Sequence, residues 1–214
     1  MLIDLDNIRN IIFDLGNVLL NLDFDRSIKA FNKLGLKQDV IDNMHIHADP
    51  VFYELSIGKV SPASFRDRIR KLLQNIKISD QEIDSAWSAM ILDVPVQRVE
   101  MLLQLKAKYK IYLFSNTNSI HINKISQEFY DQYQFEFSSL FEKVYYSHEI
   151  HKYKPDVTSY LKVIELAGIN PTESLFIDDL EPNIAGAEKA GLKTFWLKDG
   201  MEITTVLKPV ISEL

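Results

Sequence analysis

Cysteine is absent from this sequence of 214 residues, which excludes disulfide bonds, thiolate metal sites and cysteine nucleophiles. Long apolar runs are also absent, because no stretch approaches the ~20 consecutive apolar residues of a membrane-spanning helix. The N-terminus carries Asp4 and Asp6 where a secretory signal peptide needs positive charge. Together these absences predict a globular, cytoplasmic protein.

Positive charge is in the minority: 24 lysine and arginine residues face 30 aspartate and glutamate residues, for a net charge of −6. An acidic chain of this kind disfavours nucleic acid or an anionic membrane as its main partner. We therefore expect neither partner. A monomer is the default expectation.

Short apolar runs alternate with amphipathic stretches over much of the chain. Such runs, bounded by turn residues, are typical of strands buried on both faces of a parallel sheet. A helix is predicted after Pro155, ending at Gly168, and a second over 183–190. The alternation predicts an α/β fold built on a Rossmann-like doubly wound parallel sheet. The predicted strands cover residues 10–14, 111–115, 144–147, 174–178 and 193–197.

Residues 21–95 have a different pattern, helical throughout. Ser61-Pro62 opens one helix, and Ser79 with Glu82 forms a capping-box pattern ahead of another. The chain is long enough for one core domain with a substantial insertion. We therefore predict an all-helical cap domain over 21–95, inserted into a core made of 1–20 and 96–214.

Polar residues follow the predicted strands where these end, and ligands of open parallel sheets bind at that edge. Singly, each such residue has an ordinary explanation as a turn former, helix cap or surface residue. Together, three carboxylates at one edge would repel each other unless a cation lay between them. Mg²⁺ suits such oxygen ligands, and the serine, the neighbouring amides and the lysine would then hold a phosphate. The residues concerned are Asp14, Ser115-Asn116-Thr117-Asn118, Lys154 and Asp178-Asp179.

The order of these motifs resembles the haloacid dehalogenase superfamily of hydrolases. The motifs are D-x-G-N-V at 14–18, S-N at 115–116, K-P at 154–155 and D-D at 178–179. The helical insertion after the first motif resembles that superfamily's first cap type. The stretch IIFDLGNVLLNLDF is similar to a bacterial branch of sugar-phosphate phosphatases, among them enzymes acting on glucose 1-phosphate.

The resemblance implies a role for each matching residue. Asp14 would attack phosphorus and form an aspartyl-phosphate. Magnesium would be bound by Asp14, the backbone carbonyl of Gly16 and Asp179, with Asp178 close by or linked through water. Ser115 and the Asn116 amide would bind phosphoryl oxygens, with Thr117 and Asn118 in the same substrate-binding loop, and Lys154 would neutralise charge in the transition state.

Cap residues are expected to meet the substrate if the cap closes over the site. The candidates are polar or aromatic, and Tyr53 is the main one. For Trp87, packing in the apolar core is the better interpretation. His45 and His47, near Asp49, are interpreted as surface histidines rather than a metal site. With a closed cap, Glu54 and the same two histidines are also candidates for substrate contact.

Gly16 departs from the superfamily pattern, because phosphatases usually carry a second aspartate there for proton transfer. One interpretation is a phosphatase in which Asp23 stands in, although a turn or helix-cap role ahead of Ser27 is the favoured interpretation of Asp23. A second is a 2-haloacid dehalogenase, which the retained Asp178-Asp179 pair disfavours. A third is a phosphate-binding regulator with little or no turnover.

Overall fold

The computed structural model describes residues 5, 7–35 and 50–211, with side chains described up to residue 208. Its core is a five-stranded parallel sheet with the strand order β3-β2-β1-β4-β5. All five predicted strands are present, with bounds within one residue of the prediction, which confirms the predicted fold class. The strands are β1 Asn10–Phe13, β2 Lys110–Ser115, β3 Lys143–Tyr146, β4 Ser174–Asp178 and β5 Lys193–Trp196.

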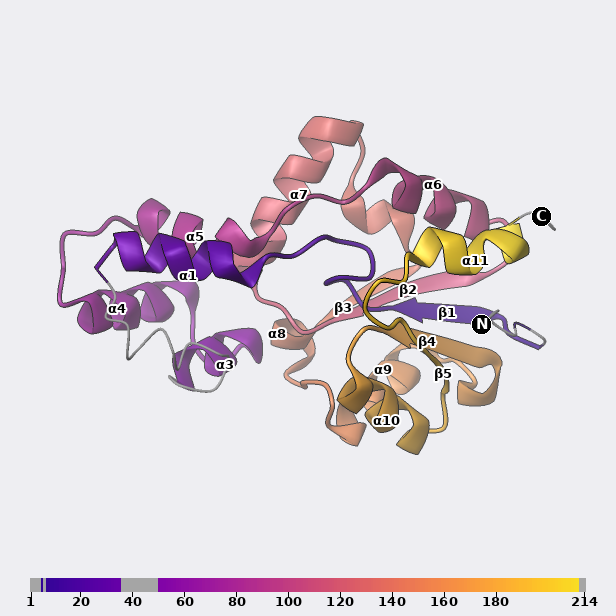
Figure 1. The fold of residues 1–214 in the computed structure, drawn as a ribbon. Coiled ribbons are helices and arrows are strands. Elements are labelled where there is room, and N and C mark those ends of the chain that lie inside the picture. The colour runs from indigo at the N-terminus through magenta and orange to yellow at the C-terminus, as the bar shows by residue number, and fades with distance from the viewer. Residues whose placement is uncertain (1–4, 6, 36–49, 212–214) are drawn as a thin grey trace.

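Helices cover both faces of the sheet, as Figure 1 shows. Alternate residues of a strand point to opposite faces, so Ile11 and Phe13 belong to one apolar cluster and Ile12 to the other. The first cluster includes residues of α6, α7 and α11, and the second includes residues of α9 and α10. These helices are α6 Val96–Leu105, α7 Ser119–Tyr133, α9 Val157–Ala167, α10 Glu181–Lys189 and α11 Ile203–Ile211. Short helices complete the core: η2 Phe137–Leu140, α8 Ser147–Ile150 and η3 Pro171–Glu173.

The cap is a separate helical lobe, drawn at the left of Figure 1. The predicted capping box is present, because the Ser79 hydroxyl accepts from the Glu82 amide while the Glu82 carboxylate accepts from the Ser79 amide. Aromatic rings form the centre of the cap: the ring centroid of Phe52 lies 5.4 Å from that of Phe65 and 4.8 Å from that of Trp87. Trp87 is 7% exposed, as expected for a core residue. The cap elements are α1 Phe24–Lys33, α3 Pro50–Ser56, α4 Pro62–Leu73, α5 Asp80–Trp87 and η1 Ser88–Met90.

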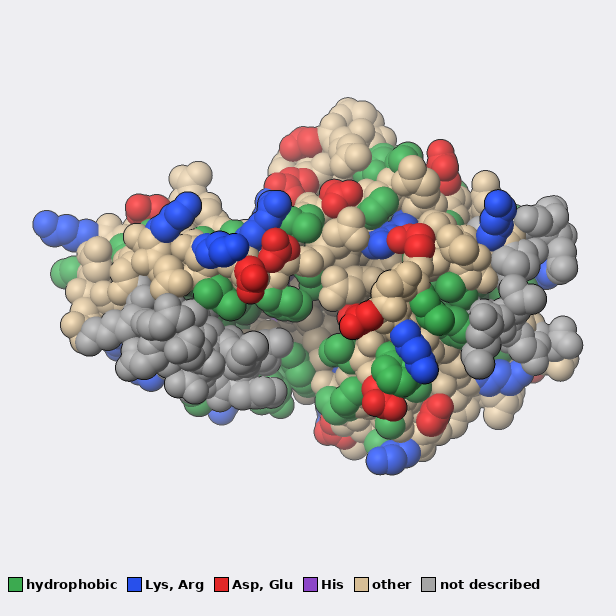
Figure 2. Space-filling view, in the orientation of Figure 1, with side chains coloured by type: hydrophobic (Ala, Val, Ile, Leu, Met, Phe, Trp, Pro, Cys, Tyr) green, Lys and Arg blue, Asp and Glu red, His purple; other side chains and the backbone are tan. Residues whose placement is uncertain are grey.

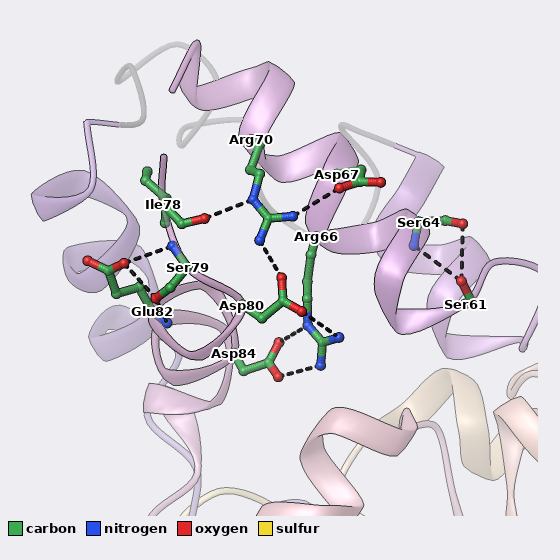
Figure 3. Close-up of polar contacts among 10 residues, drawn as sticks. All are labelled: Ser61, Ser64, Arg66, Asp67, Arg70, Ile78, Ser79, Asp80, Glu82 and Asp84. Carbon is green, nitrogen blue, oxygen red and sulfur yellow. Dashed lines mark hydrogen bonds and ion pairs between the residues drawn. The ribbon is translucent and has the colours of Figure 1, made fainter. Parts of the chain in front are cut away.

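Ion pairs join α4 to α5 on the cap (Figure 3). Arg66 binds both oxygens of Asp84, at 2.8 Å from Nε and 2.6 Å from Nη2, and also contacts Asp80. Arg70 contacts Asp80 as well and donates to the carbonyl of Ile78 at 2.8 Å. Paired guanidinium–carboxylate contacts of this kind fix direction as well as distance. The two helices are therefore held in one relative orientation.

Two connections link the cap to the core, and they lie side by side. The Asn21 amide donates to the Asp93 carbonyl at 2.9 Å, and the Leu92 amide donates to the Asn21 carbonyl at 3.1 Å. The Asn21 side chain also donates to the Asp93 carboxylate at 3.0 Å. Both connections lie at the ends of the segment that the sequence assigns to the cap, although the domain boundaries themselves stay a prediction.

Direct contacts also hold the cap against the core. The Ser147 hydroxyl of α8 donates to the Ser56 carbonyl of the cap at 2.5 Å. Gly58, with φ +68°, lies so close to the core that an added Cβ would be 2.2 Å from the His148 carbonyl oxygen. On α7, the His121 ring lies 4.8 Å from the Trp87 ring, and its Nε2 is 3.3 Å from the Trp87 carbonyl.

Burial of His121 at this contact predicts acid sensitivity. Burial lowers its pKa from 6.5 to about 4, so between these values the unfolded chain binds a proton that the folded chain excludes. The contribution of His121 to the free energy of unfolding should therefore fall as pH drops from about 6.5 to about 4. Urea unfolding of the wild type and of His121→Gln across this range measures it, and the wild type should show the steeper loss. Parallel pH profiles would contradict the assignment.

Candidate active site

The candidate site lies at the carboxyl edge of the sheet, where three aspartates converge. Asp14 follows β1, and its amide donates to the Ile177 carbonyl of β4 at 2.9 Å. Asp178 is the last residue of β4 and Asp179 follows it. One carboxylate oxygen from each of the three aspartates lies within 4.8 Å of the others. The parallel register, which places Phe13 beside both Leu113 and Ile177, brings these strand ends together.

Lys154 occupies the centre of this cluster and is 1% exposed. Its Nζ lies 2.7 Å from Asp14 Oδ1, 2.7 Å from Asp178 Oδ2 and 3.1 Å from the Phe114 carbonyl. The Asn116 side chain fixes the lysine backbone, because it accepts from the Lys154 amide at 3.0 Å and donates to the Lys154 carbonyl at 2.9 Å. The lysine is therefore anchored at both its backbone and its ammonium group.

Burial dominates the electrostatics of the cluster. It raises the pKa of Asp14 to about 7, with Lys154 opposing the rise and the charges of Asp178 and Asp179 adding to it. Burial also raises the pKa of Asp179, again helped by Asp178. For Lys154, burial lowers the pKa, but the two carboxylates outweigh it and the net pKa is raised. One ammonium among three carboxylates leaves an excess of negative charge, which a bound cation would offset.

The three aspartates differ in how fully protein donors engage them. Asp178 accepts from Lys154, from the Leu180 amide at 2.9 Å and from the Asn183 side chain at 2.9 and 3.0 Å.

 Asp179 accepts from the Asn17 side chain at 3.2 Å, and its backbone carbonyl accepts from the Trp196 indole at 2.9 Å. Asp178 is thus the more fully engaged of the two, and Asp14 and Asp179 are the better placed to offer oxygens to a metal ion. An all-oxygen donor set of this kind suits Mg²⁺.

Gly16 lies beside this cluster, in the short turn that follows Asp14. A Cβ added to Gly16 would lie 2.6 Å from the Leu22 Cδ1 atom. The superfamily pattern has an aspartate at this position. A methyl group of Leu22 therefore occupies the space that the aspartate side chain would need. The backbone carbonyl of Gly16 does not depend on the side chain at this position, so it can still serve as an oxygen ligand.

The loop after β2 has two kinds of residue. Ser115 is the last residue of β2 and is buried. The Thr117 backbone bonds to the Ser147 hydroxyl through both its amide, at 2.9 Å, and its carbonyl, at 3.0 Å. The Asn118 side chain caps α7 by accepting from the His121 amide at 3.1 Å. Thr117 and Asn118 therefore support the fold of the loop, and their predicted contact with substrate stays a prediction.

Asp23 is the N-cap of α1. Its carboxylate accepts from the Asp25 amide at 3.1 Å and lies 3.4 Å from Arg26 Nε. Among the contacts of the described residues, none joins Asp23 to the three aspartates. The structure thus shows the helix-cap role that the sequence left open, and the proton-transfer role has no contact that supports it.

Tyr53 of α3 is 41% exposed, and its ring lies 5.3 Å from that of Tyr153 in an edge-to-face arrangement. Tyr153 directly precedes Lys154, and sequence reasoning missed it because a tyrosine in a loop carries no pattern of its own. Glu54 forms an ion pair with Lys59 at 2.7 Å. His45 and His47 lie outside the described residues.

The fold and the site together define a Rossmann-like hydrolase with a helical cap. The chain belongs to the haloacid dehalogenase-like hydrolase family, which matches residues 8–191.

Several relatives cover nearly the whole chain. It is 30% identical over 205 residues to a D-ribitol-5-phosphate phosphatase of Bacteroides thetaiotaomicron, covering 94% of this chain and 98% of the relative. A HAD family enzyme of the same organism, solved with magnesium and inorganic phosphate, is 36% identical with a TM-score of 0.81, over 91% and 96% of the two chains. A predicted HAD-like hydrolase of Porphyromonas gingivalis is 29% identical with a TM-score of 0.85, over 96% and 97%. A 2-haloacid dehalogenase of Pseudomonas syringae, at 15% identity, shares the fold alone.

Removal of Lys154 should destabilise the protein strongly. In Lys154→Met the buried carboxylates of Asp14 and Asp178 lose their cation, and breaking a buried ion pair typically costs about 3–5 kcal/mol. Urea unfolding with EDTA present measures the loss, with Lys152→Met as the control at a more exposed lysine. Equal stability of the two variants would show that Lys154 does not hold the cluster together.

Proposed function

We propose that this protein is a magnesium-dependent phosphomonoester hydrolase with Asp14 as its nucleophile. The observation that carries the proposal is the buried cluster at the sheet edge, in which Lys154 Nζ lies 2.7 Å from Asp14. A buried carboxylate paired with a lysine suits nucleophilic attack on a phosphate, because the lysine offsets part of the negative charge. The two further carboxylates suit a magnesium ion that would offset the rest.

Magnesium would be held by Asp14, the Gly16 carbonyl and Asp179. Asp178 would orient Lys154 and, through the Leu180 amide, the loop that follows β4. The all-oxygen donor set and the excess negative charge both support this assignment. When bound, the ion would offset charge on the phosphate and on the nucleophile. Asn17 and Trp196, which bond to Asp179, would keep that ligand in place.

The reaction would proceed in two displacements at phosphorus. In the first, a carboxylate oxygen of Asp14 bonds to phosphorus and the bond to the ester oxygen breaks; the departing oxygen takes a proton from water, since Gly16 has none to give. In the second, water adds to phosphorus and the bond to Asp14 breaks, which releases inorganic phosphate and restores the carboxylate. Ser115 and the Asn116 amide would bind phosphoryl oxygens, and Lys154 would balance their charge.

The substrate would be a phosphate ester of a small polyol or sugar. The support is the whole-length similarity to a D-ribitol-5-phosphate phosphatase, together with the ring contact between Tyr53 of the cap and Tyr153, the residue before Lys154. A hexose 1-phosphate, the substrate class suggested by the sequence resemblance, belongs in the same test panel. In the part of the chain that the structure describes, no helix has the length and apolar character of a membrane span. Figure 2 shows acidic and basic side chains interspersed on the face drawn, which fits a small-molecule substrate. We also propose that the protein is a cytoplasmic monomer.

A phosphate-binding regulator is the second candidate, and Gly16 favours it. Without a side chain at this position the chain lacks the usual proton donor, and Leu22 fills the space. The dehalogenase interpretation has less support, because the likeness to dehalogenases is one of fold and the carboxylate cluster suits a cation.

Phosphate release from small esters tests the proposal. Wild type should release phosphate from ribitol 5-phosphate, hexose phosphates or p-nitrophenyl phosphate with Mg²⁺ and not with EDTA. Asp14→Asn keeps the shape and removes the nucleophile, so release should fall by about 10⁴-fold or more. Asp25→Asn, at an exposed position on α1, is the control and should retain activity. Release from no ester by wild type would favour the phosphate-binding candidate.

Restoring the aspartate at position 16 should accelerate turnover once space is made for it. General acid–base help is typically worth about 10²–10⁴ in rate. We expect Gly16→Asp combined with Leu22→Ala to raise kcat on alkyl phosphates about 10²-fold, and Gly16→Asp alone to gain less. Steady-state kinetics of the single and double variants measure this. Equal or lower kcat in the double variant would show that proton transfer does not limit the wild type.

A further inference from the structure

Tyr153 connects the cap to the loop that carries Lys154. Its ring meets Tyr53 of α3 at 5.3 Å with an interplanar angle of 72°. Because Tyr153 directly precedes Lys154, this contact joins the cap to the residue next to the central cation of the site.

The hydroxyl of Tyr153 lies in the electrostatic field of the site. The charges of Lys154 and Asp14 both act on its pKa, as does the Asn116 side chain. Burial raises its pKa above the ordinary value of 10.0, so the hydroxyl remains protonated over the physiological range. Chemically it is a hydrogen-bond donor next to the residue that pairs with the nucleophile, not a base.

We propose that Tyr153 is a specificity-determining residue, whose hydroxyl donates a hydrogen bond to a substrate hydroxyl near the phosphate. The proposal rests on the proposed function, since it assigns a role at that same site. The ring contact with Tyr53 would hold the donor in place as the cap covers the substrate. A polyol phosphate offers such a hydroxyl, whereas p-nitrophenyl phosphate does not.

This arrangement has a consequence for selectivity. A site built to hydrogen-bond a substrate hydroxyl discriminates against analogues that lack it, because its polar group is then left unpaired. Loss of the tyrosine hydroxyl should therefore reduce activity on the polyol ester and leave activity on the aryl ester unchanged. A residue with only a structural role would affect both esters alike.

Tyr153→Phe tests the proposal, because it keeps the ring and removes the hydroxyl. We expect kcat/KM for ribitol 5-phosphate to fall about 10-fold, as for one lost hydrogen bond, and kcat/KM for p-nitrophenyl phosphate to change less than about 2-fold. Tyr130→Phe, at an exposed tyrosine of α7 outside the site, is the control and should leave both values unchanged. Thermal unfolding of each variant verifies the fold.

Equal losses on both esters, or no loss on either, would overturn the role of Tyr153. The proposed function is tested separately by the wild type, whose Mg²⁺-dependent release of phosphate from p-nitrophenyl phosphate does not involve the substrate hydroxyl. Absence of that release would overturn the proposed function and this proposal with it. Its presence, with unchanged selectivity in Tyr153→Phe, would overturn this proposal alone.

Discussion

The contact of Lys154 with Asp14 and Asp178 is the interaction on which the rest of the site depends. Three carboxylates at one sheet edge repel each other. The buried ammonium group of Lys154, 2.7 Å from two of them, offsets part of this repulsion. The parallel register brings the strand ends together, and Asn116 fixes the lysine backbone. Charge compensation therefore determines both the stability of this edge and the chemistry that it can support.

The cap adds a second layer of organisation to this edge. Ion pairs join α4 to α5, and an aromatic centre joins α3 to α4 and α5. The cap contacts the core through the paired connections at Asn21 and Asp93, through Trp87 and His121, and through Tyr53 and Tyr153. In the last contact Tyr153 directly precedes Lys154, which is why substrate selectivity is proposed there.

Much of this could be predicted from the sequence, because the strands are buried runs with polar residues at their ends. Asp14, Lys154 and Asp178 were found in this way, and the structure places them in contact. Three features could not be predicted: the leucine methyl beside Gly16, the two bonds from Asn116 to Lys154, and the approach of Tyr153 to Tyr53. Each depends on tertiary packing between segments far apart in the chain, which local patterns do not encode.

The central claim is that Asp14 carries the phosphoryl group during turnover. The most direct test is to mix the enzyme with Mg²⁺ and p-nitrophenyl phosphate, quench in acid within milliseconds, and map the modified peptide by mass spectrometry. The account predicts a phosphoryl group on Asp14 that hydroxylamine removes. Turnover without any phosphorylated peptide, or with the phosphoryl group on another residue, would contradict it.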